Sequence, residues 1–259
     1  MPAELKSSGQ GQTLVLTISN PEHRNALGPE IYAAAVEALS VVETAPDVRS
    51  VVITGEGAMF CAGGQLQRLQ ANRQQPPSVQ AESIEGLHAW IEAIHTCPKP
   101  VIAAVEGAAA GAGFSLALAC DFLVAADNAV FVMAYANIAL SPDGGGSWSL
   151  ARALPRALAT ELLMTGDKIG AQRLHALGVV NRTTPPGGAL AEALALAERL
   201  NAKAPNALGS IKELVNEASV SKLHDQLSRE RDHFVRNLQH RNAGIAIEAF
   251  LTKQTPRFD

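Results

Sequence analysis

Through the first half of this chain, short apolar runs alternate with longer segments that have helical periodicity. Several runs are apolar over their whole length, as expected for strands that are buried on both faces. Alternation of this kind predicts a parallel sheet whose strands are joined by crossover helices. The expected strands are Thr13–Ser19, Ser50–Thr54, Val101–Val105, Phe122–Ala125 and Val130–Met133, and the clearest helices among them are Glu30–Val42 and Val79–Thr96.

The second half of the chain has almost no strand pattern after about residue 147, and helical patterns predominate. Pro185–Gly188 is the strongest linker signal, because two prolines are followed by two glycines. We therefore expect an α/β core over residues 1–200 and a helical section over residues 201–259 that makes subunit contacts. The expected helices are Ala157–Thr165, Ala171–Leu177, Ala189–Asn201, Pro205–Ala218, Leu223–Leu238 and Ala243–Lys253.

The composition excludes several classes of protein. Apolar residues make up 47% of the 259 positions and charged residues 18%, which is typical of a folded globular chain. The net charge of −4 argues against a general nucleic-acid partner. No apolar run reaches the ~18 residues of a membrane span, and the N-terminus resembles no secretory signal. Three widely spaced cysteines predict neither a disulfide framework nor a zinc site, so we expect a cytoplasmic protein without a membrane partner.

Two turns rich in small residues each follow a buried strand. Ala58–Leu66 contains two adjacent glycines, and Ala104–Asp121 contains a run of alanines and glycines before a helical segment. Glycines allow a tight turn, and the first N–H groups of a helix have no partner within it, so such turns suit an anion or an oxyanion. Each turn alone is also compatible with an ordinary strand-to-helix connection or with close helix packing. The spacing fits neither a dinucleotide fingerprint nor a P-loop, and Ser115 lacks the glycines of a nucleophile elbow.

Two such turns in one chain are more informative than either alone. Backbone N–H groups from two separate turns could converge on one carbonyl oxygen and stabilise the enolate or tetrahedral oxyanion of a thioester. Removal of one donor from such a hole typically costs about 2.7–4 kcal/mol of activation free energy.

In the order and spacing of its motifs, the chain resembles the enoyl-CoA hydratase/isomerase family, also called the crotonase superfamily. The resemblance extends from about residue 12 to residue 253. It implies an α/β fold with a crotonase-like (ClpP/crotonase) β-β-α spiral core and a helical C-terminal section. It also implies a homotrimer or a dimer of trimers. The matching segments are His23–Leu27, Phe60–Gly64, Ala104–Asp121, Phe131–Asp143, Leu163–Asp167, Ala171 and Leu177–Asn181.

The resemblance also implies roles for particular residues. The amides of Gly64 and Ala112 would form the oxyanion hole. Lys253, beside Phe250, is a candidate to contact CoA phosphates within its own subunit or a neighbouring one, although a solvated surface charge is the alternative. CoA would arrive with the acyl-CoA substrate, and no metal or other cofactor is expected. The residues implied to line the CoA channel are Arg24, Ala26, Ala62 and Leu66.

At two positions the chain departs from the hydratases that it resembles. Those enzymes use two glutamates to activate water, and the matching residues here are Ser115 and Tyr135. Neither is a carboxylate, so we expect both to face the thioester and to bind substrate or water. Asp143 lies where several isomerases of the family have their catalytic carboxylate, and one carboxylate is sufficient to move a proton between two carbons. A turn or N-cap role is the alternative for Asp143.

His88 opens a further alternative. One branch, resembling 4-chlorobenzoyl-CoA dehalogenase, pairs an aspartate at position 143 with a histidine at position 88. The tryptophans of that branch are replaced by Leu87 and Tyr135, so an ordinary, partly exposed histidine is expected. Asp143-based isomerisation of an unsaturated acyl-CoA is therefore the leading hypothesis. The alternatives are hydration or hydrolysis of an enoyl-CoA or cyclic acyl-CoA, and a CoA-thioester-binding protein with little catalysis.

Overall fold

Six strands form the main sheet of the computed structural model, which describes residues 3–258. Neighbouring strands are parallel from β2 to β9, as predicted, and only β1 is antiparallel to its neighbour β2. The sheet order is β1 (Glu4–Gln10), β2 (Thr13–Ser19), β3 (Ser50–Gly55), β4 (Val101–Val105), β6 (Phe122–Ala126) and β9 (Arg182–Thr184).

A second, smaller sheet contains β5 (Ala108–Ala110), β7 (Val130–Val132) and β8 (Lys168–Gly170). The chain passes directly from β4 in the main sheet to β5 in the small one, and again from β6 to β7. Between these two passages the buried helix α4 (Ala112–Ala119) returns the chain to the main sheet. The repeated strand–strand–helix path is the spiral that the sequence resemblance implies.

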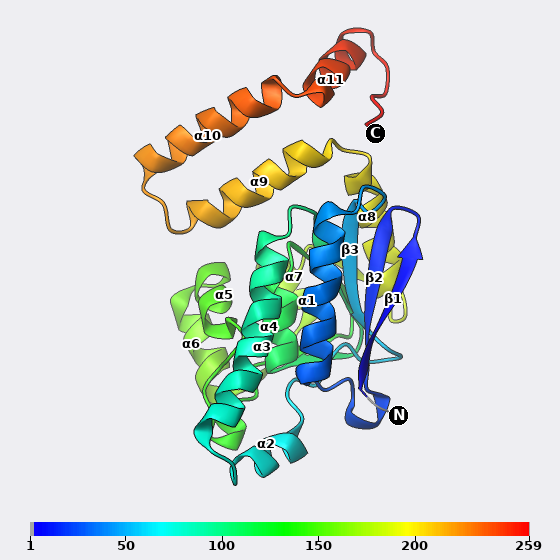
Figure 1. Ribbon diagram of the computed structural model, residues 1–259. Helices are drawn as coiled ribbons and strands as arrows, with labels where there is room; N and C mark the ends of the chain where they lie inside the picture. The colour runs from blue at the N-terminus through cyan, green and yellow to red at the C-terminus, as the bar shows by residue number, and fades with distance from the viewer. Residues whose placement is uncertain (1–2, 259) are drawn as a thin grey trace.

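Helices cover both faces of the main sheet (Figure 1). Alternate residues of a strand point to opposite faces, so Leu16 and Ile53 join the core beneath α1 (Pro29–Thr44) and α3 (Pro77–Thr96). Their neighbours Val15 and Val52 pack on the other face beneath α8 (Ala189–Asn201). The remaining helices of the core are α2 (Leu66–Asn72), α5 (Gly146–Ala153), α6 (Arg156–Thr165) and α7 (Ala171–Ala176).

Three C-terminal helices, α9 (Pro205–Ala218), α10 (Leu223–Leu238) and α11 (Arg241–Leu251), lie together at one end of the molecule, while α2 lies at the opposite end (Figure 1). The Lys212 ammonium anchors α9 to the core through Asp121 Oδ2 and the Ile94 carbonyl, both at 2.7 Å. Large apolar side chains, including Phe234 and Phe250, remain exposed on these helices. The division of the chain at residue 200 stays a prediction. Among residues 3–258, none of the helices is long and apolar enough to cross a membrane.

Four strands were not predicted from the sequence. β1 is polar and almost wholly exposed, so its sequence has no alternation of apolar and polar residues. It forms a strand because its backbone pairs with β2. The segment around residues 107–113 was expected to begin a helix, but Ala108–Ala110 pairs with β7 and the helix begins only at Ala112. β8 and β9 have three residues each, which is too short for any periodic pattern.

The predicted linker at Pro185–Gly188 is a turn joining β9 to α8 rather than a flexible connection. The carboxylate of Glu106 accepts hydrogen bonds from the backbone N–H of Gly187 at 3.1 Å and of Ala189 at 2.8 Å. Proline and glycine therefore mark a tight turn here, which the half-buried Glu106 carboxylate holds in place.

Candidate active site

The two turns rich in small residues lie in direct backbone contact. A Cβ atom added to Gly63 would lie 2.6 Å from the Ala110 carbonyl oxygen and 3.2 Å from the Ala112 nitrogen, and the φ of Gly63 is +87°. Only glycine allows this approach in this conformation. The contact is reinforced beside the turn, where Cys61 exchanges hydrogen bonds with Ala108 and Ala110 at 3.1 and 2.9 Å.

The contact leaves two backbone donors available on adjoining segments. Within residues 3–258, neither the Gly64 N–H nor the Ala112 N–H donates a hydrogen bond. Ala112 is the first residue of α4, so its N–H lies at the positive end of the helix, and Gly64 is exposed. Two unpaired N–H groups on touching turns form a suitable receptor for one carbonyl oxygen that gains negative charge.

The loop that follows β2 lies against the glycine turn at residues 63–64. Arg24 and Asn25 adopt left-handed backbone conformations, with φ of 53° and 58°. The buried Asn25 amide holds the loop by donating to the carbonyls of Glu56 and Met59 at 2.9 and 2.7 Å. The Arg24 carbonyl accepts from Ala62 N at 3.1 Å, which joins the loop to the glycine turn. The structure thus brings Arg24, Ala26 and Ala62 to one site, and Leu66 begins α2 just beyond Gly64.

Asp143 lies in the loop before α5 and is held from two sides. The Tyr135 hydroxyl donates to Asp143 Oδ1 at 2.6 Å, and the Ser115 hydroxyl donates to the Asp143 carbonyl at 2.9 Å. Ser115 follows Ala112 by three residues on α4, and a Cβ atom on Gly144 would lie 3.2 Å from the Ser115 Cβ. The aspartate loop therefore packs within one helical turn of the candidate oxyanion hole.

Ser115 and Tyr135 thus have partners that the sequence did not predict. Both were expected to face the thioester, but their hydroxyls are hydrogen bonded to Asp143. Burial, followed by the negative charge of Asp143, raises the pKa of Tyr135 above its ordinary value. The phenol therefore remains protonated and acts as a donor to the carboxylate at neutral pH.

Cys61 and His88 do not join the reactive groups. Burial raises the pKa of the Cys61 thiol to about 12, so it is not a thiolate at neutral pH. The side chain of His88 is 41% exposed and lies 3.8 Å from the Glu85 carboxylate. Its neighbour Leu87 packs against the aspartate loop instead, 3.1 Å from the position of a Cβ on Gly144.

Lys253 is far from this site. It follows α11, at the end of the molecule opposite α2 (Figure 1). Arg49, which directly precedes β3, donates a hydrogen bond to the Phe258 carbonyl and fixes the C-terminal segment at that end. Within one chain, Lys253 is therefore separated from Gly64 and Ala112.

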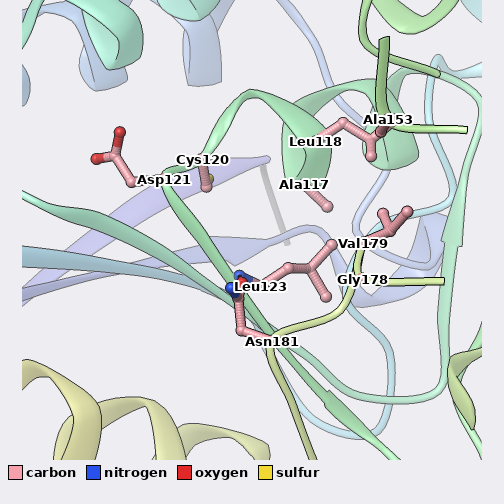
Figure 2. Close-up of a pocket in the computed structure, with 9 residues that line it drawn as sticks. All are labelled: Ala117, Leu118, Cys120, Asp121, Leu123, Ala153, Gly178, Val179 and Asn181. Atoms are coloured by element: carbon pink, nitrogen blue, oxygen red, sulfur yellow. Dashed lines mark hydrogen bonds between the residues drawn. The ribbon is translucent and has the colours of Figure 1, made fainter. Parts of the chain in front are cut away.

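Two cavities lie at the C-terminal end of α4, away from Ala112. The smaller, of about 180 Å³, is drawn in Figure 2 between α4, Ala153 and the segment 178–181. The larger, of about 380 Å³, extends beneath α9 past Trp148. None of the predicted site residues, all within residues 3–258, lines either cavity, so the candidate site is defined by its contacts and not by these hollows.

Sequence reasoning missed Tyr32 and Arg68. Tyr32 is a buried residue of α1, and the charges of Asp143 and Arg68 act on its phenol. Arg68 of α2 lies against Gly28 and pairs with Glu30 at 3.2 Å. The available signal was a tyrosine at a buried position of a helix, where its hydroxyl requires a partner.

Comparison with known proteins identifies the family. The family model described as "Enoyl-CoA hydratase/isomerase" matches residues 9–259. This chain belongs to the enoyl-CoA hydratase/isomerase family. Members act on acyl-CoA, so the chain is an enzyme of this type, and the crotonase fold implied by the sequence resemblance is confirmed.

Individual relatives cover almost the whole chain. The 1,2-epoxyphenylacetyl-CoA isomerase of Escherichia coli K12 is 36% identical over 248 residues, covering 95% of this chain and 94% of the relative. The 2,3-dehydroadipyl-CoA hydratase of the same strain is 33% identical over 256 residues, covering 99% and 98%. The crystal structure of an enoyl-CoA hydratase from Polaromonas sp. JS666 has a TM-score of 0.98 and 70% identity, covering 99% and 100%. Isomerase and hydratase names thus both occur among similar proteins.

Proposed function

We propose that this enzyme isomerises an unsaturated acyl-CoA by moving a proton from one carbon of the acyl group to another. Asp143 is the base and then the acid, and the N–H groups of Gly64 and Ala112 bind the thioester oxygen. One observation carries the proposal: the loop that holds the oriented Asp143 carboxylate packs on Ser115, one helical turn from Ala112, whose unpaired N–H adjoins the turn of Gly64.

The reaction balances with these groups alone. Asp143 takes a proton from an acyl carbon, and the electron pair of the broken C–H bond moves into the conjugated system that ends at the thioester oxygen. The Gly64 and Ala112 N–H groups stabilise the resulting enolate. The protonated carboxyl then returns its proton to a different carbon, the electron pair forms that C–H bond, and the double bond has moved.

Hydration is less well supported, because addition of water requires one group to deprotonate water and another to protonate carbon. The hydroxyls of Ser115 and Tyr135 are already bound to Asp143, and neither is a carboxylate. This leaves one carboxylate for two tasks.

A panel of CoA thioesters tests the proposal. Purified enzyme is mixed with cis- and trans-3-enoyl-CoA and with trans-2-enoyl-CoA, and the absorbance of the conjugated thioester is followed. An increase from the 3-enoyl substrates supports isomerisation. Loss of absorbance from trans-2-enoyl-CoA, with a hydroxyacyl product by mass, would support hydration instead. Binding without turnover across the panel would support a CoA-thioester-binding protein.

We also propose a homotrimer or a dimer of trimers. The exposed apolar side chains of α9–α11 support this proposal, because they would otherwise face water. Assembly would also give Lys253 access to the CoA of a neighbouring subunit, which its distance from the site of its own chain prevents. Sedimentation analysis of the purified protein tests the stoichiometry. CoA enters with the substrate, and the cytoplasmic location stays a prediction.

A further inference from the structure

Tyr32 is held rigidly beside the candidate active site. The residue is 7% exposed, and its ring lies on Trp90 with centroids 6.4 Å apart. On α3, a Cβ atom on Gly86 would lie only 3.2 Å from the Tyr32 ring. The next residue, Leu87, packs against the aspartate loop at Gly144. Adjacent residues of α3 thus connect Tyr32 to the loop of Asp143.

The hydroxyl of Tyr32 is unusual for a residue that is almost fully buried. No hydrogen bond reaches it from residues 3–258, although the ring is almost fully buried. It is not one of the enclosed, unpaired polar atoms of the described chain, whereas Arg68 Nη1 is one of them. The small exposed part of Tyr32 therefore includes the hydroxyl. A hydroxyl that opens at the edge of an otherwise buried ring is accessible to water or to a ligand, and a ligand that displaces the water must offer an acceptor in its place.

The charges around the hydroxyl indicate what it would meet. Burial, then the negative charge of Asp143, raises the pKa of Tyr32 well above its ordinary value, and the charge of Arg68 opposes this. The phenol is therefore a neutral donor at physiological pH. The ion pair with Glu30 reduces the attraction of Arg68 for an anion. The complementary group is a neutral acceptor close to the carbons on which Asp143 acts.

We propose that Tyr32 is a specificity residue that donates a hydrogen bond to an oxygen carried by the acyl group. Preferred substrates are thus acyl-CoA thioesters whose acyl chain bears a hydroxyl, ether or similar neutral oxygen. The inference rests on the proposed function, because that function places the acyl chain of the substrate beside Asp143. The proposed function already assigns the Gly64 and Ala112 N–H groups to the thioester oxygen, and the Tyr135 hydroxyl donates to the carboxylate.

Calorimetric binding to two variants tests the inference without turnover. The variants are Asp143→Asn and the double variant Asp143→Asn/Tyr32→Phe. The probes are hexanoyl-CoA and hydroxyhexanoyl-CoA thioesters with the hydroxyl at successive carbons of the chain. In Asp143→Asn, we expect one hydroxylated thioester to bind about tenfold more tightly than hexanoyl-CoA. In the double variant this preference should disappear while the affinity for hexanoyl-CoA is retained, which also shows that the site is folded.

Two results would overturn the inference: equal affinity for all thioesters in Asp143→Asn, or a preference that persists after Tyr32→Phe. The proposed function fails separately. If the variants bind hexanoyl-CoA but the wild type moves no double bond in any enoyl-CoA, the isomerase proposal is wrong. The preference for a hydroxylated thioester, and its loss in the double variant, would still test the role of Tyr32. If Asp143→Asn binds hexanoyl-CoA and the double variant does not, the inference is also wrong, because Tyr32 would then hold the site together and not select for an acyl oxygen.

Discussion

The Tyr135 hydroxyl donates a 2.6 Å hydrogen bond to Asp143 Oδ1, whereas within residues 3–258 no hydrogen bond reaches Asp143 Oδ2. The two carboxylate oxygens are therefore not equivalent. Oδ1 is fixed by a phenol whose burial keeps it protonated, and Oδ2 remains free to accept a proton from carbon. Because Ser115 fixes the backbone of the same residue, the free oxygen has a defined position.

Replacing Tyr135 with phenylalanine should lower kcat by about 10- to 100-fold, because the carboxylate loses its orientation. KM for the CoA thioester should change little. Steady-state kinetics measure both parameters. A KM that rises together with the fall in kcat would indicate only a packing role for Tyr135.

Asp143→Asn should reduce turnover by about 10²- to 10⁴-fold, the usual contribution of a general acid–base group. Binding of the CoA thioester should remain, because the backbone donors are unchanged. Calorimetry and single-turnover assays separate the two effects. Ser115→Ala is the matched comparison, because it removes only the bond to the Asp143 carbonyl and should have a smaller effect. Full activity of Asp143→Asn would refute the assignment.

Gly63→Ala should open the oxyanion hole, because the new Cβ would lie 2.6 Å from the Ala110 carbonyl oxygen. Loss of one donor lowers kcat by about 10²- to 10³-fold. Gly57→Ala is the control: Gly57 also has a positive φ, of 74°, but nothing lies within 4 Å of its added Cβ. Both variants should lose about 1–3 kcal/mol of stability from backbone strain. Only Gly63→Ala should lose activity, and equal losses of kcat would contradict the role of the turn.

Lys212→Met should destabilise the protein by about 3–5 kcal/mol, because it leaves the Asp121 carboxylate buried without its cation. The Lys212 and Asp121 side chains are only 9% and 19% exposed. Lys6→Met is the matched surface control, because Lys6 pairs with Glu56 at 2.8 Å but both side chains are about 40% exposed. Solvent screens an exposed pair, so Lys6→Met should lower stability far less than Lys212→Met. Urea unfolding of both variants measures the difference, and similar midpoints would show that the Lys212 pair is not stabilising.

The sequence was sufficient to predict the strands and helices that have a clear pattern of apolar residues. The continuous apolar runs of β3 and β4 and the long helices α1 and α3 are local patterns, and the structure contains them. β5, β8 and β9 have three residues each and exist only because a partner strand lies beside them. Pairing of that kind depends on the whole fold, so no local pattern indicates it.

For the candidate site, the sequence indicated the residues but not the contacts between them. Glycine turns after buried strands indicated backbone donors, and the family resemblance selected Gly64, Ala112 and Asp143. The bonds of Ser115 and Tyr135 to Asp143 were not predictable, because alignment gives a position but not a partner. Tyr32 was missed because a helix that packs on the core has the same apolar pattern whether or not one of its hydroxyls reaches the surface.

The close contact between Gly63 and the Ala110–Ala112 turn has a consequence for how activity is lost on heating. The donors lie on backbone held by the ladder between Cys61 and β5, and α4 is buried along almost its whole length. Local fraying of a surface loop would not separate them. The oxyanion hole should therefore persist until the core itself melts, and the hydrogen-bonded amides of Cys61 and Ala110 that hold it together should exchange hydrogen only through global opening.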